Sequence, residues 1–285
     1  MRNNKMKKIK YLVLILSFLY RVAYSYTTAT VESMGGVTNF VYGVESVFTN
    51  SAFITNIKGS QIMMDYKKFF SISLEQNVEG YTPADISNIL FATKFDLDKN
   101  FSYGIGIGLL NITNFYNETE FVFAGGYNRE VEIIENNIEF NLAGQVVSKF
   151  IDFYDTEYEK TKKFYINLFV AMRYKNFIFS ISTNKVFKKT DNDEPLEFMP
   201  EVSYNWLDKV LVSLRIQIVP QIELKTGVEY KLKENFFFRS GINNNEFSLG
   251  LGIKIKKIDL NISSVYPYKY FQVLPQLRTG IVYNW

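Results

Sequence analysis

Apolar and polar side chains alternate along most of this chain, and the pattern is clearest in residues 247–285. Between positions 247 and 255 the odd positions are all apolar, whereas the even positions are serine, glycine or lysine. This period of two is typical of a β-strand with one apolar and one polar face. Residues 258–263 and 277–285 repeat the pattern. The carboxyl-terminal part is therefore predicted to form successive antiparallel strands.

The same alternation runs through the chain from residue 59 onward. It is present in residues 70–78, 91–97, 101–109, 138–142, 164–173, 210–218 and 222–231. No lysine or arginine occupies the apolar face of the later segments. A charged side chain that faces lipid costs about 2 to 4 kcal/mol near the bilayer midplane. The pattern therefore predicts an all-β fold, a transmembrane antiparallel β-barrel that occupies residues 59–285.

The number of strands is constrained by topology. Fifteen candidate segments are present, but a single-chain bacterial barrel with both termini in the periplasm has an even number of strands. The weakest candidates are residues 61–66 and 119–127, and we predict fourteen strands. Short turns such as Lys256–Lys257 are expected at the periplasmic end, with the carboxyl terminus, and longer charged loops such as 151–162 at the other end.

Glycine occupies every second position of one face in residues 101–109, at Gly104, Gly106 and Gly108. Two interpretations are open. The glycines relieve strand curvature, or they leave room on the inner wall for neighbouring side chains or a plug.

The first 25 residues have the features of a secretory signal peptide. Basic residues occupy the start, residues 11–19 are almost all apolar, and the stretch closes with Ala23-Tyr24-Ser25. A basic start, a short apolar stretch and a small-x-small end predict cleavage after Ser25 and export from the cytoplasm. The alternatives are an uncleaved membrane anchor or a buried helix, for which the apolar stretch is short.

Composition narrows the classes of protein further. Hydrophobic residues make up 47% of the chain and aromatic residues 17%, yet the mean hydropathy is −0.06, so apolar residues are interleaved rather than gathered into helical spans. The formal charge is +3, with dispersed basic residues, and nucleic acid is not an expected partner. The chain has no cysteine and no histidine. Zinc sites built from these residues and Ser-His-Asp catalysis are therefore excluded, and we expect neither an enzyme nor a cofactor.

Residues 26–58 do not alternate and form a predicted plug segment. Their apolar positions, among them Val37, Val41 and Val44, have spacings that predict a short amphipathic helix. The segment resembles the amino-terminal signature of PorV/PorQ-type and FadL-like outer-membrane barrels, a Met-Gly-Gly-Ala followed by a helical stretch and Asn-Pro-Ala. The matching residues are Met34, Gly35, Gly36, Asn50, Ser51 and Ala52, with Ser51 in place of the proline. The resemblance implies a fourteen-strand barrel plugged near its periplasmic end; the alternative is an ordinary periplasmic extension.

The last strand also carries a resemblance. Ile281, Tyr283 and Trp285 lie on one face and end the chain with an aromatic residue, which resembles the carboxyl-terminal targeting strand of bacterial outer-membrane barrels. This implies the outer membrane as the location, its lipid as a partner, and the barrel-assembly machinery as a partner that reads this strand.

Charges of both signs are predicted on the face that lines the lumen. They are Arg173, Arg215, Glu223, Lys225, Glu229, Arg239, Lys254, Asp259 and Arg278. In a barrel of this size, opposite charges either cross-link through the lumen and hold a plug, or line a narrow pore. Both interpretations are open.

Three functions are compatible with these features. The FadL-like resemblance implies a channel or transporter for a hydrophobic small molecule. The PorV-like resemblance implies instead a non-enzymatic outer-membrane component of a protein-secretion system, which carries a secreted protein. Alternation alone also permits a secreted soluble β-sandwich, because the two faces of a strand exchange roles between a sandwich and a membrane barrel.

Overall fold

The computed structural model describes residues 27–69, 86–112, 116–133, 136–153, 160–189, 195–218, 222–268 and 276–285. The predicted signal peptide and the alternating segment 70–78 lie outside these ranges. Among the described residues, no helix is both long and apolar enough to cross a membrane.

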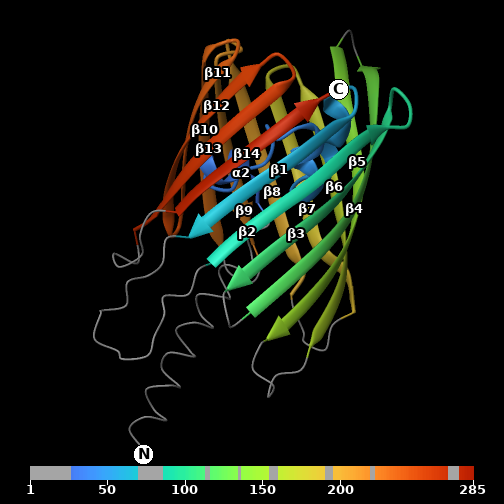
Figure 1. Cartoon of the computed structure of the whole chain (residues 1–285). Helices are drawn as coiled ribbons and strands as arrows, with labels where there is room; N and C mark the ends of the chain where they lie inside the picture. Colours follow the sequence, from blue (N-terminus) through green and yellow to red (C-terminus); the bar gives the residue numbers. More distant parts are fainter. Residues whose placement is uncertain are drawn as a thin grey trace, which may run out of the picture.

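The described residues form fourteen antiparallel strands in one closed barrel, so the predicted fold and strand number are confirmed (Figure 1). Both weak candidates are strands, since residues 61–66 lie in β1 and residues 119–127 in β4. The strands are β1 (Gln61–Phe69), β2 (Ile86–Asp96), β3 (Phe101–Ile112), β4 (Tyr116–Ile133), β5 (Asn136–Phe153), β6 (Thr161–Tyr174), β7 (Phe177–Lys189), β8 (Glu197–Trp206), β9 (Val210–Gln217), β10 (Glu223–Lys233), β11 (Phe236–Asn243), β12 (Glu246–Ile255), β13 (Ile258–Pro267) and β14 (Gln276–Asn284).

The first and last strands close the barrel. Gln61 of β1 pairs with Asn284 of β14, and the register continues to Lys68 opposite Leu277. Closure matters because hydrocarbon penalises unpaired backbone N–H and C=O groups. The soluble β-sandwich alternative is wrong, since the described strands form one closed sheet rather than two sheets packed face to face.

Side chains alternate between the outside of the barrel and its lumen. At β14 and the final residue, Ile281, Tyr283 and Trp285 are 48%, 41% and 49% exposed. Arg278, on the opposite face of the same strand, is 0% exposed. Lys94 on β2 is likewise fully buried. The outer surface is thus apolar and the charged side chains of these strands face the lumen, which is the arrangement that a lipid environment requires.

The connections differ from the predicted division into short turns and long loops. Lys175–Asn176 and Lys256–Lys257 join their strands at the carboxyl-terminal end of the barrel, as predicted. Asn244–Asn245 form an equally short turn at the opposite end, which contradicts a strict division. The reason is local, because the Asn243 side chain accepts hydrogen bonds from the amides of Asn245 and Glu246 at 2.9 and 3.0 Å.

Residues 27–58 lie inside the barrel, where Figure 1 shows them in blue. They form α2 (Ala29–Ser33) and two 3-10 helices, η1 (Gly43–Phe48) and η2 (Ser51–Asn56). The segment is therefore helical, but in three short pieces rather than as one amphipathic helix. Gly35, Gly36 and Gly43 have φ angles of +68°, +95° and +67°, a left-handed conformation that interrupts a helix.

Candidate functional site

The segment of residues 27–58, named here the plug, lies across the lumen. Its helix α2 contacts β11 to β14, whereas η2 contacts β3 to β6 on the other side. Its residues from Thr28 to Thr55 are almost all buried. The plug therefore touches most of the inner wall, and the contacts that hold it define the candidate site.

One anchor of the plug is the carboxylate of Glu201 on β8. It accepts hydrogen bonds from the Thr38 amide at 2.8 Å, the Asn39 amide at 2.7 Å and the Thr38 hydroxyl at 2.9 Å. Arg215 lies 3.9 Å from the same carboxylate and donates to the Gly36 carbonyl at 3.2 Å. A carboxylate held by several donors is a strong, oriented contact.

A second anchor binds the start of the plug to the seam of the barrel. Asp65 on β1 forms an ion pair with Arg278 on β14 and accepts a hydrogen bond from the Ala29 amide at 2.8 Å. Glu32 of α2 pairs with Lys67. Burial alone would raise the pKa of Glu32, but Lys67 and Arg278 together hold it below its ordinary value.

Glycines in the wall let the plug backbone approach closely. A Cβ atom added at Gly241 would lie 2.1 Å from the Gly35 amide nitrogen, and one at Gly106 would lie 2.6 Å from the Phe48 ring. At Gly104 the obstacle is Val47 at 2.4 Å. Of the two interpretations of the alternating glycines, the second therefore holds for Gly104 and Gly106, which leave room for the plug.

The residues of the Met-Gly-Gly signature lie against one wall. Met34 is fully buried beside Val31, Val37 and Val41, and the Gly35 amide donates to the Ser248 hydroxyl at 3.0 Å. The glycines supply the left-handed turn by which the chain leaves α2.

The Asn-Ser-Ala residues lie against the opposite wall. Asn50 caps η2 by accepting from the Ala52 amide at 3.3 Å and donates to the Ser180 hydroxyl at 3.3 Å. Ala52 packs in a cluster with Phe169. Ser51 stands where the signature that this segment resembles has proline, and it is the first residue of η2, a position that accepts proline as well as other residues. Its hydroxyl donates to the Ser46 carbonyl at 3.2 Å.

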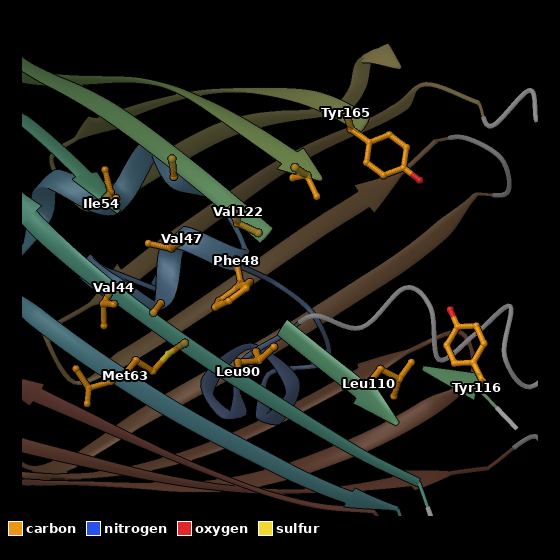
Figure 2. Close-up of a cluster of buried hydrophobic side chains, with 14 of the residues drawn as sticks. Val44, Val47, Phe48, Ile54, Met63, Leu90, Leu110, Tyr116, Val122 and Tyr165 are labelled. Atoms are coloured by element: carbon orange, nitrogen blue, oxygen red, sulfur yellow. The ribbon is translucent and has the colours of Figure 1, made fainter. Parts of the chain in front are cut away.

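An apolar surface continues from the plug along the inner face of β2 to β6, and we name it the apolar wall (Figure 2). Val44, Val47, Phe48 and Ile54 belong to the plug. The strands contribute Leu90, Leu110, Ile112, Tyr116, Val122, Val147 and Tyr165, with Ile151 and Phe153 packed against them. Within this wall a charged cluster is buried, in which Lys149 lies 2.8 Å from Glu118 and 3.3 Å from Glu120.

The remaining lumen is polar, and the nine charged positions predicted there lie on inward-facing positions of their strands. Six ion pairs among the described residues involve them: Arg239 with Glu229 at 2.7 Å, Arg173 with Glu139 at 3.2 Å, Lys225 with Glu223 at 3.4 Å, Arg215 with Glu201 at 3.9 Å, and Arg278 with both Asp65 and Glu32. The Lys254 ammonium lies 5.3 Å from the centroid of the Phe237 ring. Asp259 of β13 is opposite Lys254 of β12 in the register of the two strands. Sequence reasoning missed Glu201 and Asp65, whose partners are plug backbone amides that no pattern identifies.

A cavity of about 580 Å³ opens between the plug and the turns at the carboxyl-terminal end of the barrel. Its lining includes Tyr42 and Glu45 of the plug and Arg239 and Lys254 of the wall. Burial raises the pKa of Glu45 to about 7, against the opposing effect of nearby Arg239. Burial also raises the pKa of Tyr42, whose ring lies 5.6 Å from the Arg173 guanidinium. The cavity is therefore a mixed-charge vestibule on one side of the plug, with the apolar wall on the other.

Among the described residues, no group of three or more acidic, histidine or cysteine side chains has an arrangement that would hold a metal ion.

Solved structures with the same fold include two toluene transporters and a hydrocarbon channel. The toluene transporter TbuX of Ralstonia pickettii matches with a TM-score of 0.58 at 11% identity, over 90% of this chain and 97% of that one. The CymD monoaromatic hydrocarbon channel matches with a TM-score of 0.62 at 10% identity, over 91% and 97%. The toluene transporter TodX of P. putida matches with a TM-score of 0.55 at 9% identity, over 90% and 98%.

These are FadL-family barrels, and at such identities the likeness establishes the fold alone. No protein-family model matches this chain. No curated protein sequence matches it either.

Proposed function

We propose that this protein is an outer-membrane β-barrel that passes a hydrophobic small molecule across the membrane. The observation that carries the proposal is the apolar wall, because its buried apolar side chains form one cluster with those of the plug, and the charges of Lys149, Glu118 and Glu120 beside them pair with one another. A route for an apolar molecule needs such a surface, since an uncharged hydrocarbon gains nothing from a polar pore. The fold that this chain shares with toluene transporters supports the same proposal.

The location follows from the surface. Large apolar side chains alternate around the outside of the strands, and a closed barrel with this surface is suited to the bacterial outer membrane. Export through the predicted signal peptide and assembly through the carboxyl-terminal strand belong to the proposal. The alternative role in protein secretion rests on the resemblance at Met34–Gly36 and Asn50–Ala52, and stays a prediction.

Uptake of labelled toluene by a bacterial host that lacks a hydrocarbon transporter tests the proposal. Expression of the chain is expected to raise the uptake rate above that of the empty host. Leu110→Asn places an amide in the apolar wall and should reduce the rate, because the passing molecule would meet a polar group. Gln217→Asn, on the inner face of β9 across the lumen, is the matched control.

Two results would contradict the proposal. One is an uptake rate equal to that of the empty host when the barrel is present in the membrane. The other is equal loss of uptake in Leu110→Asn and Gln217→Asn, which would assign the effect to assembly.

A further inference from the structure

Strand β4 runs past its neighbour β3 at the end of the barrel that carries the carboxyl terminus. Phe101 at the start of β3 pairs with Tyr127, and the Asn128 amide donates to the Asn100 carbonyl at 2.8 Å. Beyond this point β4 continues to Ile133, paired with β5 alone. No described residue pairs with positions 129–133 on the β3 side. Figure 1 shows this hairpin rising above the loop that joins β2 to β3.

The register of β4 determines which backbone groups lie on this free edge. Successive residues of an antiparallel strand direct their N–H and C=O groups to alternate sides. Since the Asn128 amide faces β3, the backbone groups of Glu130 and Glu132 face the free edge, whereas Arg129, Val131 and Ile133 pair with β5. Five strand residues expose roughly 17 Å of edge at about 3.4 Å per residue, enough for a short strand to pair.

One face of the overhang is acidic, whereas the exposed Arg129 lies on the other face together with Val131 and Ile133. Glu130 and Glu132 are exposed and lie on the same face of β4, where Glu130 is opposite Glu139 of β5. Proteins protect free edges with proline, bulges or charge, and here the overhang contains charge but no proline, and its register with β5 is continuous. The two carboxylates repel an acidic strand and attract a basic one. The edge is therefore expected to pair selectively with basic segments.

A second copy of this chain is a poor occupant. If two β4 overhangs paired antiparallel about Val131, Glu130 of each copy would face Glu132 of the other. Like charges directly opposite one another destabilise a strand pair. An extended segment with lysine or arginine at every second position would instead place its cations over Glu130 and Glu132.

We propose that residues 129–133 of β4 form a β-augmentation site for an extended basic segment of a periplasmic protein. Backbone hydrogen bonds from Glu130 and Glu132 supply the affinity, and their carboxylates select the partner. This site lies on the barrel rim and rests on the proposed outer-membrane location with the carboxyl-terminal end in the periplasm, but not on the passage of a small molecule through the lumen.

Binding of a labelled peptide to the full chain in detergent micelles tests the site. The probe is a fluorescent peptide in which valine alternates with lysine or arginine; a control peptide keeps the charges but has proline at each valine position and cannot pair as a strand. The first peptide should bind at least tenfold more tightly. Equal binding of both peptides, or no binding of either, would overturn the proposal.

Variants of the chain locate the peptide. Glu132→Pro removes one N–H from the free edge and leaves the hydrogen bonds to β5, and it should weaken binding at least tenfold. Glu130→Lys should do the same through charge, whereas Glu234→Lys, in the exposed β10–β11 turn, should have no effect. Binding that Glu132→Pro and Glu130→Lys leave unchanged would refute the site.

Cross-linking provides a readout that does not depend on those variants folding like the wild type. Because the chain has no cysteine, Glu132→Cys introduces a single thiol beside the edge. A peptide with one cysteine should form a disulfide there and not at Glu234→Cys. Equal cross-linking at both positions would contradict the proposed site.

Discussion

Replacement of Glu201 with alanine tests whether the wall holds the plug as the structure indicates. The change removes the acceptor for the Thr38 and Asn39 amides, which lie 2.8 and 2.7 Å from the carboxylate. A hydrogen bond to a charged group contributes about 1.5 to 3 kcal/mol. Since about 1.4 kcal/mol is a tenfold change in an equilibrium constant, each amide should open roughly ten to a hundred times more often.

Hydrogen exchange of the full chain in micelles measures this directly. The Thr38 and Asn39 amides should exchange faster by that factor in Glu201→Ala, whereas amides in the β8–β9 ladder should change little because the barrel hydrogen bonds remain. Ser203→Ala, on the same strand and facing Ser213 rather than the plug, is the matched control. Unchanged exchange at Thr38 and Asn39 in Glu201→Ala would refute the reasoning.

Three further predictions concern the outer face, a wall glycine and pH. Leu251→Arg should impair assembly, at a cost of about 2 to 4 kcal/mol, because the side chain faces lipid. Lys254→Gln should be tolerated. Heat-modifiable bands of equal intensity for the two variants on a gel would contradict the assignment of Leu251 to the outer face of β12. Gly241→Ala should displace the plug and expose it to protease, because the new Cβ would lie 2.1 Å from the Gly35 nitrogen, while Gly144→Ala, whose nearest contact is at 4.0 Å, should not; equal cleavage would contradict this. The raised pKa of Glu45, about 7 against 4.5, means that the folded state binds its proton more tightly, so its contribution to stability is present below pH 4.5 and is lost as pH rises through 7. Glu45→Gln should therefore reduce the change in the thermal unfolding midpoint between pH 5 and pH 8. An unchanged pH dependence of the midpoint would exclude Glu45 as its source.

The barrel could be predicted because its cause is local. A strand between lipid and a wet lumen must alternate, and the odd and even positions of residues 247–255 record that constraint directly. The fifteen candidate strands had to be reduced to fourteen, because a barrel with both termini on one side has an even number of strands. The sequence did not reveal the full extent of β4, because the polar residues Asn117, Thr119 and Arg129 occupy outward-facing positions near its two ends, where the pattern predicts apolar side chains.

The conformation and anchoring of the plug could not be predicted in the same way. The spacing of Val37, Val41 and Val44 suits a helix, but glycines with positive φ angles and contacts with the wall set the actual path. Glu201 meets Thr38 across 163 positions of sequence, and no periodic pattern records such a contact. Gly104 and Gly106 were visible in the sequence, but only the packing of Val47 and Phe48 shows their use.

Ionic conductance in a planar bilayer tests most directly whether the plug fills the lumen. The full chain should conduct ions poorly, because residues 27–58 contact both sides of the inner wall. A variant that lacks these residues, with a closed barrel verified by heat modifiability, should form stable open pores. A full chain that conducts as well as the deletion variant would contradict a filled lumen.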